Sequence, residues 1–144
     1  MEVLLRKVII NDYEQIHELC EHDLGYKCNK EQVKIHLSNL DCNRECVFVA
    51  VFDDKVVGFI HVEKYETLYM PKMANILGIA VMNKFRRQGI GKKLLRIAED
   101  WAKHNGINKM RLNSGESRKE AHMFYRSMGY NDDKKQLRFI KTLI

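Results

Sequence analysis

Hydrophobic and polar positions form two different patterns along the chain, and these patterns distinguish helices from strands. An apolar residue at every third or fourth position predicts an amphipathic helix, whereas a short run of apolar and β-branched residues is typical of a buried strand. The helical pattern occupies residues 12–24, 29–40, 90–105 and 117–128. The strand pattern occupies residues 3–8, 46–52, 56–65, 74–82, 109–113 and 137–144. Together they predict the element order βααβββαβαβ.

Polar residues at three of the expected helix starts support these boundaries. Asn11 or Asp12 can cap the first helix, and Asn29 can cap the second, because short polar side chains accept hydrogen bonds from free amides there. Ser117, with Glu120 three positions later, forms the capping-box pattern for the last helix. We therefore expect side-chain caps at these starts.

The order of the elements predicts an α+β fold. Strands 46–52 and 56–65 are separated only by a polar turn, so they should form a hairpin. Strands mixed with helices in this order are typical of a three-layer αβα domain with a mixed sheet. The length of 144 residues fits one domain, for which roughly 100–150 residues are usual. We therefore expect a single domain over residues 1–144.

The composition is that of an ordinary globular protein. Hydrophobic residues make up 45% and charged residues 31%, a balance that argues against intrinsic disorder. The longest apolar runs are far shorter than the roughly 20 residues that a membrane-spanning helix needs, and the first residues lack the pattern of a secretory signal. We expect a soluble, cytoplasmic protein without a membrane partner.

The cysteines agree with a reducing compartment. Cys20, Cys28, Cys42 and Cys46 lack the paired Cys-x-x-Cys spacing of a zinc site. A chain of this size and apolar content also needs no disulfide framework. We therefore expect reduced, mostly structural thiols and no bound metal.

Charge is unevenly distributed along the chain, which carries a net charge of +6. Residues 84–96 are rich in lysine and arginine and contain no acid, whereas residues 12–23 are acidic and contain neither lysine nor arginine. A basic cluster can bind nucleic acid, but the sequence has no helix-turn-helix, zinc-finger or aromatic-basic strand signature. We therefore expect no nucleic-acid partner.

The basic cluster lies where strand 74–82 gives way to a helix, and two glycines stand in the connecting turn. Free amides at a helix start and the positive end of the helix dipole attract anions, and glycine lets the backbone approach a ligand closely. Such a junction is typical of a phosphate-binding site. The spacing excludes a dinucleotide-binding fingerprint, since position 94 is Leu94, and a Walker loop, since position 86 is Arg86.

Two motifs resemble those of the Gcn5-related N-acetyltransferase (GNAT) superfamily. Arg86, Gly89 and Gly91 are spaced as in its acetyl-CoA signature, which reads Arg or Gln, two residues, Gly, one residue, Gly or Ala. Residues 121–130 resemble its second motif, a helix end with Tyr followed by Gly and an aromatic residue. The predicted element order also fits the family fold. The resemblance implies an N-acetyltransferase that uses acetyl-CoA as co-substrate.

The resemblance also implies which residues bind acetyl-CoA. The backbone of Ile79, Ala80 and Val81 should hold the pantetheine arm as an added strand would. The turn and helix start should hold the pyrophosphate through Arg86, Arg87, Gln88, Gly89, Ile90, Gly91 and Lys92. The family often has Asn three positions before the Ala of the second motif, where this chain has Arg118, and Asn113 is an alternative source of that contact.

The implied reaction is direct acyl transfer to an amine. The Val81 amide should polarise the thioester carbonyl, and Tyr125 should act as the general acid that protonates the departing thiolate. Tyr125 alternatively packs in the core. The general base is left open among Glu63, Glu66, Glu116 and water.

Two histidines, His61 and His122, are by their positions more typical of structural residues than of catalytic ones. We therefore do not include them among the candidate bases.

The acceptor is less defined. Residues 111–125 resemble the aminoglycoside 6′-N-acetyltransferase-like branch, and an acidic helix over 12–23 would attract a cationic amine. We therefore expect a primary amine on a small molecule. A protein or peptide N-acetyltransferase and a catalytically silent acetyl-CoA-binding protein are the alternatives, and the sequence is compatible with a homodimer.

Overall fold

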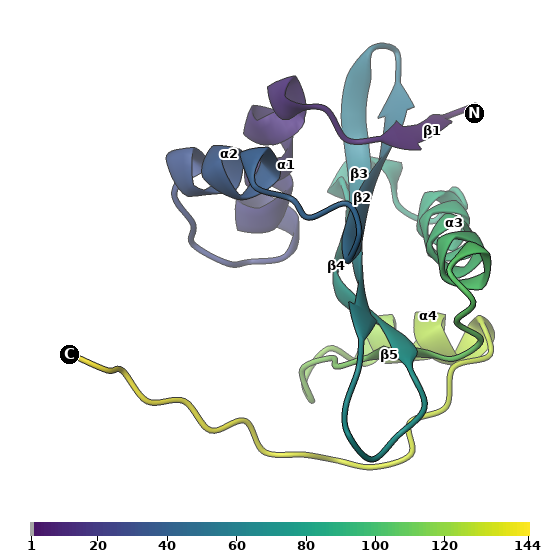
Figure 1. Ribbon diagram of the computed structural model, residues 1–144. Coiled ribbons are helices and arrows are strands. Elements are labelled where there is room, and N and C mark those ends of the chain that lie inside the picture. Colours follow the sequence, from purple (N-terminus) through teal and green to yellow (C-terminus); the bar gives the residue numbers. More distant parts are fainter. Residues whose placement is uncertain (1) are drawn as a thin grey trace. The chain divides into compact units, whose positions relative to one another are not determined.

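The computed structural model describes residues 2–144 (Figure 1). The chain forms two compact units, Met1–Leu112 and Asn113–Ile144. A five-stranded sheet in the order β1-β2-β3-β4-β5 is the centre of the first unit. Its strands are β1 (Leu4–Lys7), β2 (Glu45–Phe52), β3 (Lys55–Tyr65), β4 (Met73–Val81) and β5 (Met110–Leu112). The first four strands are antiparallel, and β5 runs parallel to β4.

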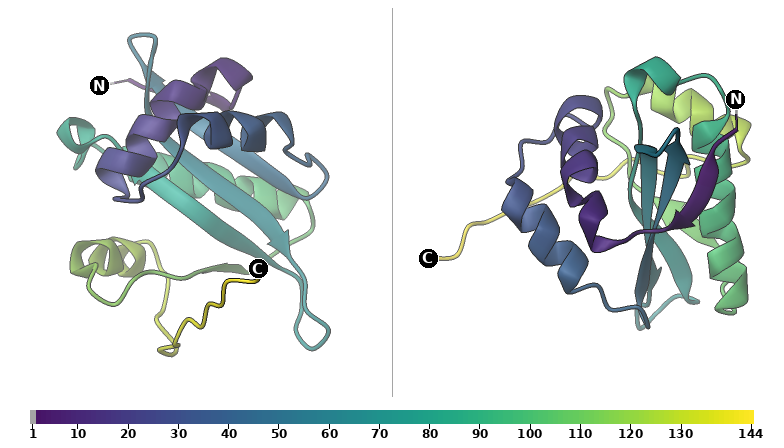
Figure 2. Two further views of the ribbon diagram at one scale, coloured as in Figure 1. Left: turned by 90° about the vertical axis from the view of Figure 1, so that its left-hand side faces the viewer. Right: turned by 90° about the horizontal axis from the view of Figure 1, so that it is seen from above.

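Helices cover both faces of this sheet, as predicted for a three-layer fold. Helices α1 and α2 lie on one face and α3 on the other (Figure 2). The helical segments of this unit are η1 (Ile10–Asp12), α1 (Tyr13–Glu18), η2 (Leu19–Asp23), α2 (Lys30–Ser38), η3 (Asn83–Phe85) and α3 (Ile90–His104). Ile16 and Leu19 belong to one buried cluster with Val49 and Phe59 of the sheet.

Local signals in the sequence explain two of these connections. The hairpin between β2 and β3 turns at Asp53 and Asp54, whose φ angles of 51° and 61° are those of a tight turn that matches strand twist. The Asn29 side chain accepts a hydrogen bond of 2.7 Å from the Glu31 amide and caps α2. Both predictions are confirmed.

Asp12 has a different role from the predicted side-chain cap of the following helix. Its carboxylate accepts hydrogen bonds from both terminal nitrogens of Arg6, at 2.8 and 3.0 Å, and from the Ile9 amide at 2.9 Å. Asp12 is 5% exposed. This buried ion pair therefore joins β1 to the start of the helical segment.

The second unit contains one helix, α4 (Lys119–Ser127), among residues 113–144. The predicted capping box is wrong, because Arg118 precedes the helix and no side chain caps it. A turn closed by the Arg118 amide and the Gly115 carbonyl, 3.1 Å apart, displaces the helix start past Ser117.

The predicted last strand at 137–144 is also wrong, and the observed order ends as βααβββαβα. Residues 131–144 form no helix or strand, and Leu137, Phe139 and Leu143 are 83%, 89% and 84% exposed. An apolar, β-branched pattern favours a strand, but a strand forms only where a neighbour supplies hydrogen bonds. The overall class is nevertheless the predicted mixed α+β fold.

Gly58 of β3 is required for close packing between the sheet and α3. An added Cβ would lie 3.0 Å from the Ala80 carbonyl oxygen and 3.1 Å from Leu94 Cδ1. We predict that Gly58→Ala lowers the free energy of unfolding by about 1–3 kcal/mol, because backbone must move to admit the methyl group. Urea denaturation measures this. Gly115→Ala is the control, since its Cβ would meet only Arg118 side-chain atoms at 3.6 Å or more; equal losses in both variants would contradict the prediction.

The Asp12 ion pair predicts a pH-dependent stability difference. Burial raises the pKa of the Asp12 carboxyl, but hydrogen bonds from Arg6 and the Ile9 amide lower it by more, so the net pKa is below its ordinary value. Its contribution is therefore complete above the unfolded pKa, about 3.9, and is lost as pH falls through the lower folded pKa. We expect Asp12→Asn to cost about 1–2 kcal/mol at pH 7. Thermal melts from pH 7 to pH 2.5 should show the difference shrinking only below about pH 4; a constant difference would disprove it.

Candidate functional site

Strand β4 has a neighbour on both sides for only part of its length. It pairs with β3 along its length except at Leu77, but its parallel pairing with β5 covers only Ala74–Ile76. From Leu77 to Val81, no strand among residues 2–144 pairs with its outer edge. This stretch can therefore receive an extended ligand through backbone hydrogen bonds.

A β-bulge explains where the two strands part. Ile76 pairs with Val62 and Gly78 pairs with His61, which leaves Leu77 as an extra residue in β4. Bulges bend the strand that carries them and leave one residue unpaired. The bend therefore coincides with the end of pairing to β5, and Leu77 is 50% exposed.

The sheet register determines which amides of β4 point outward. The Met82 amide donates to the Val57 carbonyl at 2.8 Å, so Gly58 and Val81 form a non-hydrogen-bonded pair. The N–H and C=O of Val81 consequently face the outer edge, and those of Ile79 do so by the two-residue period. The polar groups of Ala80, the third predicted pantetheine contact, face β3 instead.

The turn after β4 leads into the N-terminus of α3. Gly89 has φ = 82°, a left-handed conformation that favours glycine, and an added Cβ there would meet nothing within 4 Å. The first bond of the helix joins the Lys93 amide to the Gly89 carbonyl at 3.1 Å. The amides of Ile90, Gly91 and Lys92 therefore have no acceptor within α3, and they lie at the positive end of its dipole.

Side chains of the turn divide into two groups. Arg87, Gln88 and Lys92 are exposed beside the free amides. The Arg86 side chain instead contacts β4 and η2. Its Nε donates to the Val81 carbonyl at 3.1 Å, and its Nη2 lies 3.5 Å from the Asp23 carboxylate. Arg86 therefore joins the end of β4 to the end of η2.

Asp23 is a residue that sequence reasoning did not single out. Its carboxylate also accepts a hydrogen bond of 2.9 Å from the Asn83 amide, at the start of the turn. Asp23 precedes Asn83 by 60 residues, so its position in the acidic stretch 12–23 does not predict a contact with the turn. Asp23 holds the turn in position beside η2.

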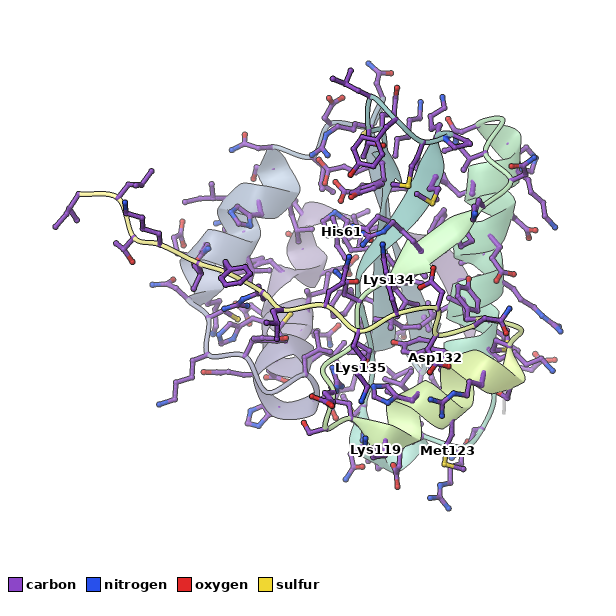
Figure 3. The ribbon with its side chains drawn as sticks, turned by 90° about the horizontal axis from the view of Figure 1, so that it is seen from below. His61, Lys119, Met123, Asp132, Lys134 and Lys135 are labelled. Atoms are coloured by element: carbon purple, nitrogen blue, oxygen red, sulfur yellow. The ribbon has the colours of Figure 1, made fainter. Side chains whose placement is uncertain are left out.

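The first unit contains a further polar cluster that crosses four strands. Glu63 accepts hydrogen bonds from Arg44 Nη1 at 2.6 Å and Asn75 Nδ2 at 2.8 Å, and Asn75 Oδ1 accepts one from Arg111 at 2.8 Å. Beside it, His61 Nε2 lies 2.8 Å from Glu45 Oε1. Figure 3 labels His61 on the sheet.

The candidate bases differ in their surroundings. Both carboxylate oxygens of Glu63 are engaged, by Arg44 and Asn75. Glu66 is exposed in the loop after β3. Glu116, in the second unit, is exposed and pairs with Lys135 at 3.2 Å; this hydrogen bond lowers the pKa of its carboxyl.

Tyr125 lies in the second unit, on α4. Its ring contacts those of Phe124 and Tyr130, with centroid distances of 5.4 and 6.3 Å. Burial raises the pKa of its phenol, an effect that the charge of Arg118 opposes without cancelling. Tyr125 therefore keeps its proton at neutral pH, as a general acid must. Asn113 begins the same unit.

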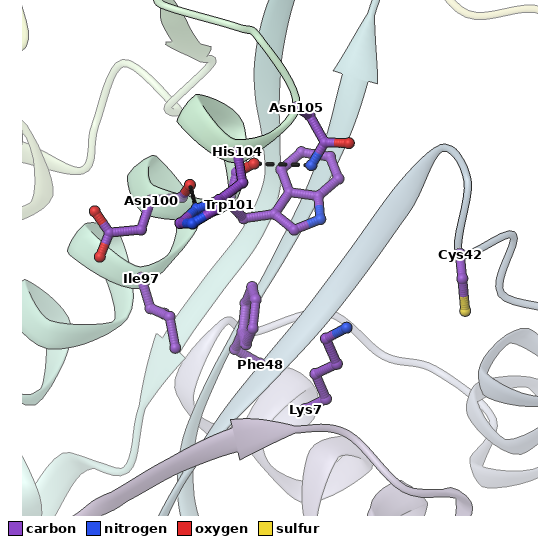
Figure 4. A pocket seen from close by; sticks show the side chains of 8 residues that line it. All are labelled: Lys7, Cys42, Phe48, Ile97, Asp100, Trp101, His104 and Asn105. Carbon is purple, nitrogen blue, oxygen red and sulfur yellow. Dashed lines mark hydrogen bonds between the residues drawn. The ribbon is translucent and has the colours of Figure 1, made fainter.

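A surface hollow of about 460 Å³ lies elsewhere on the first unit (Figure 4). It is lined by Lys7, Cys42, Phe48, Ile97, Asp100, Trp101, His104 and Asn105. Trp101 follows Ile90 by eleven positions, which places it roughly 16 Å along α3 from the helix start. The hollow is therefore separate from the glycine turn.

The cysteine and membrane questions have simple answers for the described chain. All four cysteines are free thiols, and burial raises the pKa of Cys20 to about 11. Over residues 2–144, no three histidine, cysteine, aspartate or glutamate side chains gather as a metal would require. No helix in this range has the length and apolar character to cross a membrane.

Comparisons with known proteins agree with this geometry. Two curated relatives are each 28% identical to this chain. The first is an uncharacterized N-acetyltransferase of Chlorobaculum tepidum, which matches over 94% of this chain and 79% of its own length. The second is the aminoalkylphosphonate N-acetyltransferase of Salmonella typhimurium, which matches over 91% of this chain and 82% of its own length. Among solved structures, an aminoglycoside acetyltransferase from an uncultured soil metagenomic sample is 26% identical with a TM-score of 0.80, covering 99% of this chain and 97% of its own.

A further solved structure, of an aminoglycoside N-acetyltransferase in complex with CoA, shares the fold. It is 15% identical, with a TM-score of 0.87, and covers 99% of this chain and 96% of its own. The model of the Acetyltransferase (GNAT) family matches residues 10–130. The chain therefore belongs to the GNAT family of acetyltransferases.

Proposed function

We propose that the protein transfers the acetyl group of acetyl-CoA directly to a primary amine of a small molecule. The observation that carries this proposal is two groups of free backbone donors, one on each side of the turn. The first group is the outward amides of Ile79 and Val81, and the second is the free amides of Ile90, Gly91 and Lys92. An extended ligand with an anionic group at one end fits these two groups.

The parts of acetyl-CoA match the two groups of donors. The pyrophosphate would accept hydrogen bonds from the α3 amides, with Arg87, Gln88 and Lys92 beside it. The pantetheine arm would pair with the outer edge of β4. Gly89 supports this assignment, because its missing side chain leaves the approach to the amides open.

The chemistry needs a donor for the thioester oxygen and an acid for the sulfur. In acetyl-CoA the thioester lies at the opposite end from the pyrophosphate. The outward amide farther from the turn, that of Ile79, therefore fits the carbonyl better than the amide of Val81 expected from sequence. Such a donor is worth about 3–4 kcal/mol of the barrier. Tyr125, which keeps its proton, would protonate the thiolate, and Asn113 would contact the cofactor.

The acceptor is a small primary amine in this proposal. Two similar proteins are named as acetyltransferases of aminoalkylphosphonates and of aminoglycosides. These two classes of compound share little except their amino groups. The acidic stretch contributes less attraction for a cation than its composition indicated. Asp12 and Asp23 are engaged by arginines, and Glu21 lies 3.4 Å from His17, whereas Glu14 and Glu18 are exposed.

The direct experiment is release of CoA thiol from acetyl-CoA with a panel of amines. The panel contains 2-aminoethylphosphonic acid, sisomicin, spermidine and a lysine-containing peptide. We expect turnover with at least one small amine. Turnover with the peptide alone would replace the small-molecule acceptor by a protein, and acetyl-CoA binding without any turnover would indicate a silent binder.

The glycine turn provides a prediction for acetyl-CoA binding. We expect Gly89→Glu to weaken binding at least ~100-fold, because a carboxylate would repel the pyrophosphate and obstruct contacts worth roughly 1.5–3 kcal/mol each. Calorimetry measures the affinity, and circular dichroism checks the fold. Gly106→Glu is a matched control, since Gly106 also has a positive φ, of 72°, and open space around it. Undiminished binding in Gly89→Glu would remove the turn from the site.

Tyr125 provides a prediction for turnover. We expect Tyr125→Phe to lower kcat by roughly 10²–10⁴ with acetyl-CoA affinity unchanged, since a proton donor acts only as the thiolate leaves. Steady-state kinetics with a competent amine and the thermal midpoint are measured together. Tyr130→Phe is the control, because Tyr130 belongs to the same ring cluster. An unchanged kcat with a lowered midpoint would leave Tyr125 a packing residue.

A further inference from the structure

One histidine occupies a special position on the sheet. His61 of β3 lies directly opposite Gly78 of β4, one residue beyond the bulge at Leu77. Residues opposite each other in antiparallel strands share a face, with Cα atoms about 5 Å apart. The His61 side chain therefore lies at the level where the outer edge of β4 becomes free, next to Ile79.

Gly78 places no side chain beside this histidine. A Cβ added at Gly78 would be in ordinary contact with the Phe59 ring, at 3.7 Å, and with Leu24 Cδ1, at 4.0 Å. No side chain of residue 78 occupies this space, which lies on the same face of the sheet as His61. His61 is itself 28% exposed. An amine that reaches the free edge of β4 at this level would be a neighbour of the imidazole.

Glu45 of β2 fixes the state of the imidazole. Its Oε1 lies 2.8 Å from His61 Nε2, and its other oxygen accepts a bond of 3.2 Å from the Asp41 amide. A carboxylate can only accept hydrogen bonds, so Nε2 carries the proton and the lone pair is on Nδ1. A carboxylate that orients a histidine in this way is a recurring device of base catalysis.

The charges around the pair keep Glu45 ionised. Burial raises the pKa of its carboxyl, but hydrogen bonds from His61 and the Asp41 amide lower it by more. Arg44 lies 3.4 Å from Glu45 and 2.6 Å from Glu63, the other carboxylate on this part of the sheet. The charged groups next to His61 are thus an ionised Glu45, and Glu63 with its bound Arg44.

We propose that His61 is the general base that deprotonates the acceptor amine, with Glu45 as its positioning residue. This inference rests on the proposed function, since it names a catalytic residue for that reaction. The two oxygens of Glu63 are already bound, and Glu66 is exposed in a loop. His61 has a nitrogen lone pair available and is partly exposed, opposite Gly78 where the edge of β4 becomes free.

The proton balance of the step is as follows. An alkylamine reaches the site as its ammonium ion, and Nδ1 of His61 takes one proton, which then passes to solvent. The neutral nitrogen forms a bond to the thioester carbon, and the carbon–sulfur bond breaks. The general acid gives its proton to the departing thiolate, and the nitrogen loses its second proton as the amide forms; this second proton restores the general acid. The net products are the acetamide, the CoA thiol and one released proton.

The test compares wild type with His61→Gln on whichever amine of the panel wild type acetylates fastest. We expect kcat/KM to fall about 10²-fold at pH 7. The deficit should shrink as pH rises toward the pKa of the amine, because solvent then supplies the neutral nucleophile. A purely structural role would lower the rate equally at every pH. Acetyl-CoA affinity and the thermal midpoint should stay unchanged.

Two further variants make the result decisive. Glu45→Gln should show a smaller loss with the same recovery at high pH, and it replaces His61→Gln if that variant does not fold. His104→Gln, at the far end of α3, should behave as wild type. If wild type acetylates no amine, the proposed function fails and the base assignment with it. If wild type is active and His61→Gln is unimpaired, or impaired equally at all pH values, only the base assignment is overturned.

Discussion

The separation of β4 from β5 at Leu77 is the constraint on which the candidate site depends. Three residues of β4 have strand partners on both sides, Leu77 has none, and residues 78–81 have a partner only in β3. Backbone N–H and C=O groups need partners wherever water is excluded. The edge is therefore a fixed set of backbone groups, among them the amides of Ile79 and Val81, that a ligand with amide groups can satisfy, although the Val81 carbonyl already accepts a hydrogen bond from Arg86.

A site built from backbone needs a rigid frame more than particular side chains. The frame here is made of contacts between distant parts of the chain. Arg86 and Asp23 connect the turn to η2, and Gly58 allows α3 to pack closely against the sheet. Side chains at Ile79 and Val81 do not determine where their amides point, because the register with β3 does.

The sequence predicted the features that depend on neighbouring residues. The Asp53–Asp54 turn and the Asn29 cap are set within a few positions, and each is confirmed. The strand predicted at 137–144 does not form, because a strand needs a neighbouring strand for its hydrogen bonds and an apolar pattern alone is not enough. The glycine turn was found through its own spacing. Contacts such as Asp23 with Asn83, or Glu45 with His61, depend on how strands and helices align over many residues, and no local signal marks them.

The polar cluster on the sheet distributes charge so that one base stays available. Two arginines, Arg44 and Arg111, hold Glu63 and Asn75 in a chain of hydrogen bonds across the strands. Both carboxylate oxygens of Glu63 are engaged in this chain as hydrogen-bond acceptors. Glu45, in contrast, directs one carboxylate oxygen to Nε2 of His61, and the lone pair on the other ring nitrogen stays available. The hydrogen bonds that occupy Glu63 also fix the strand positions next to His61, and this supports the proposal of His61 as the base.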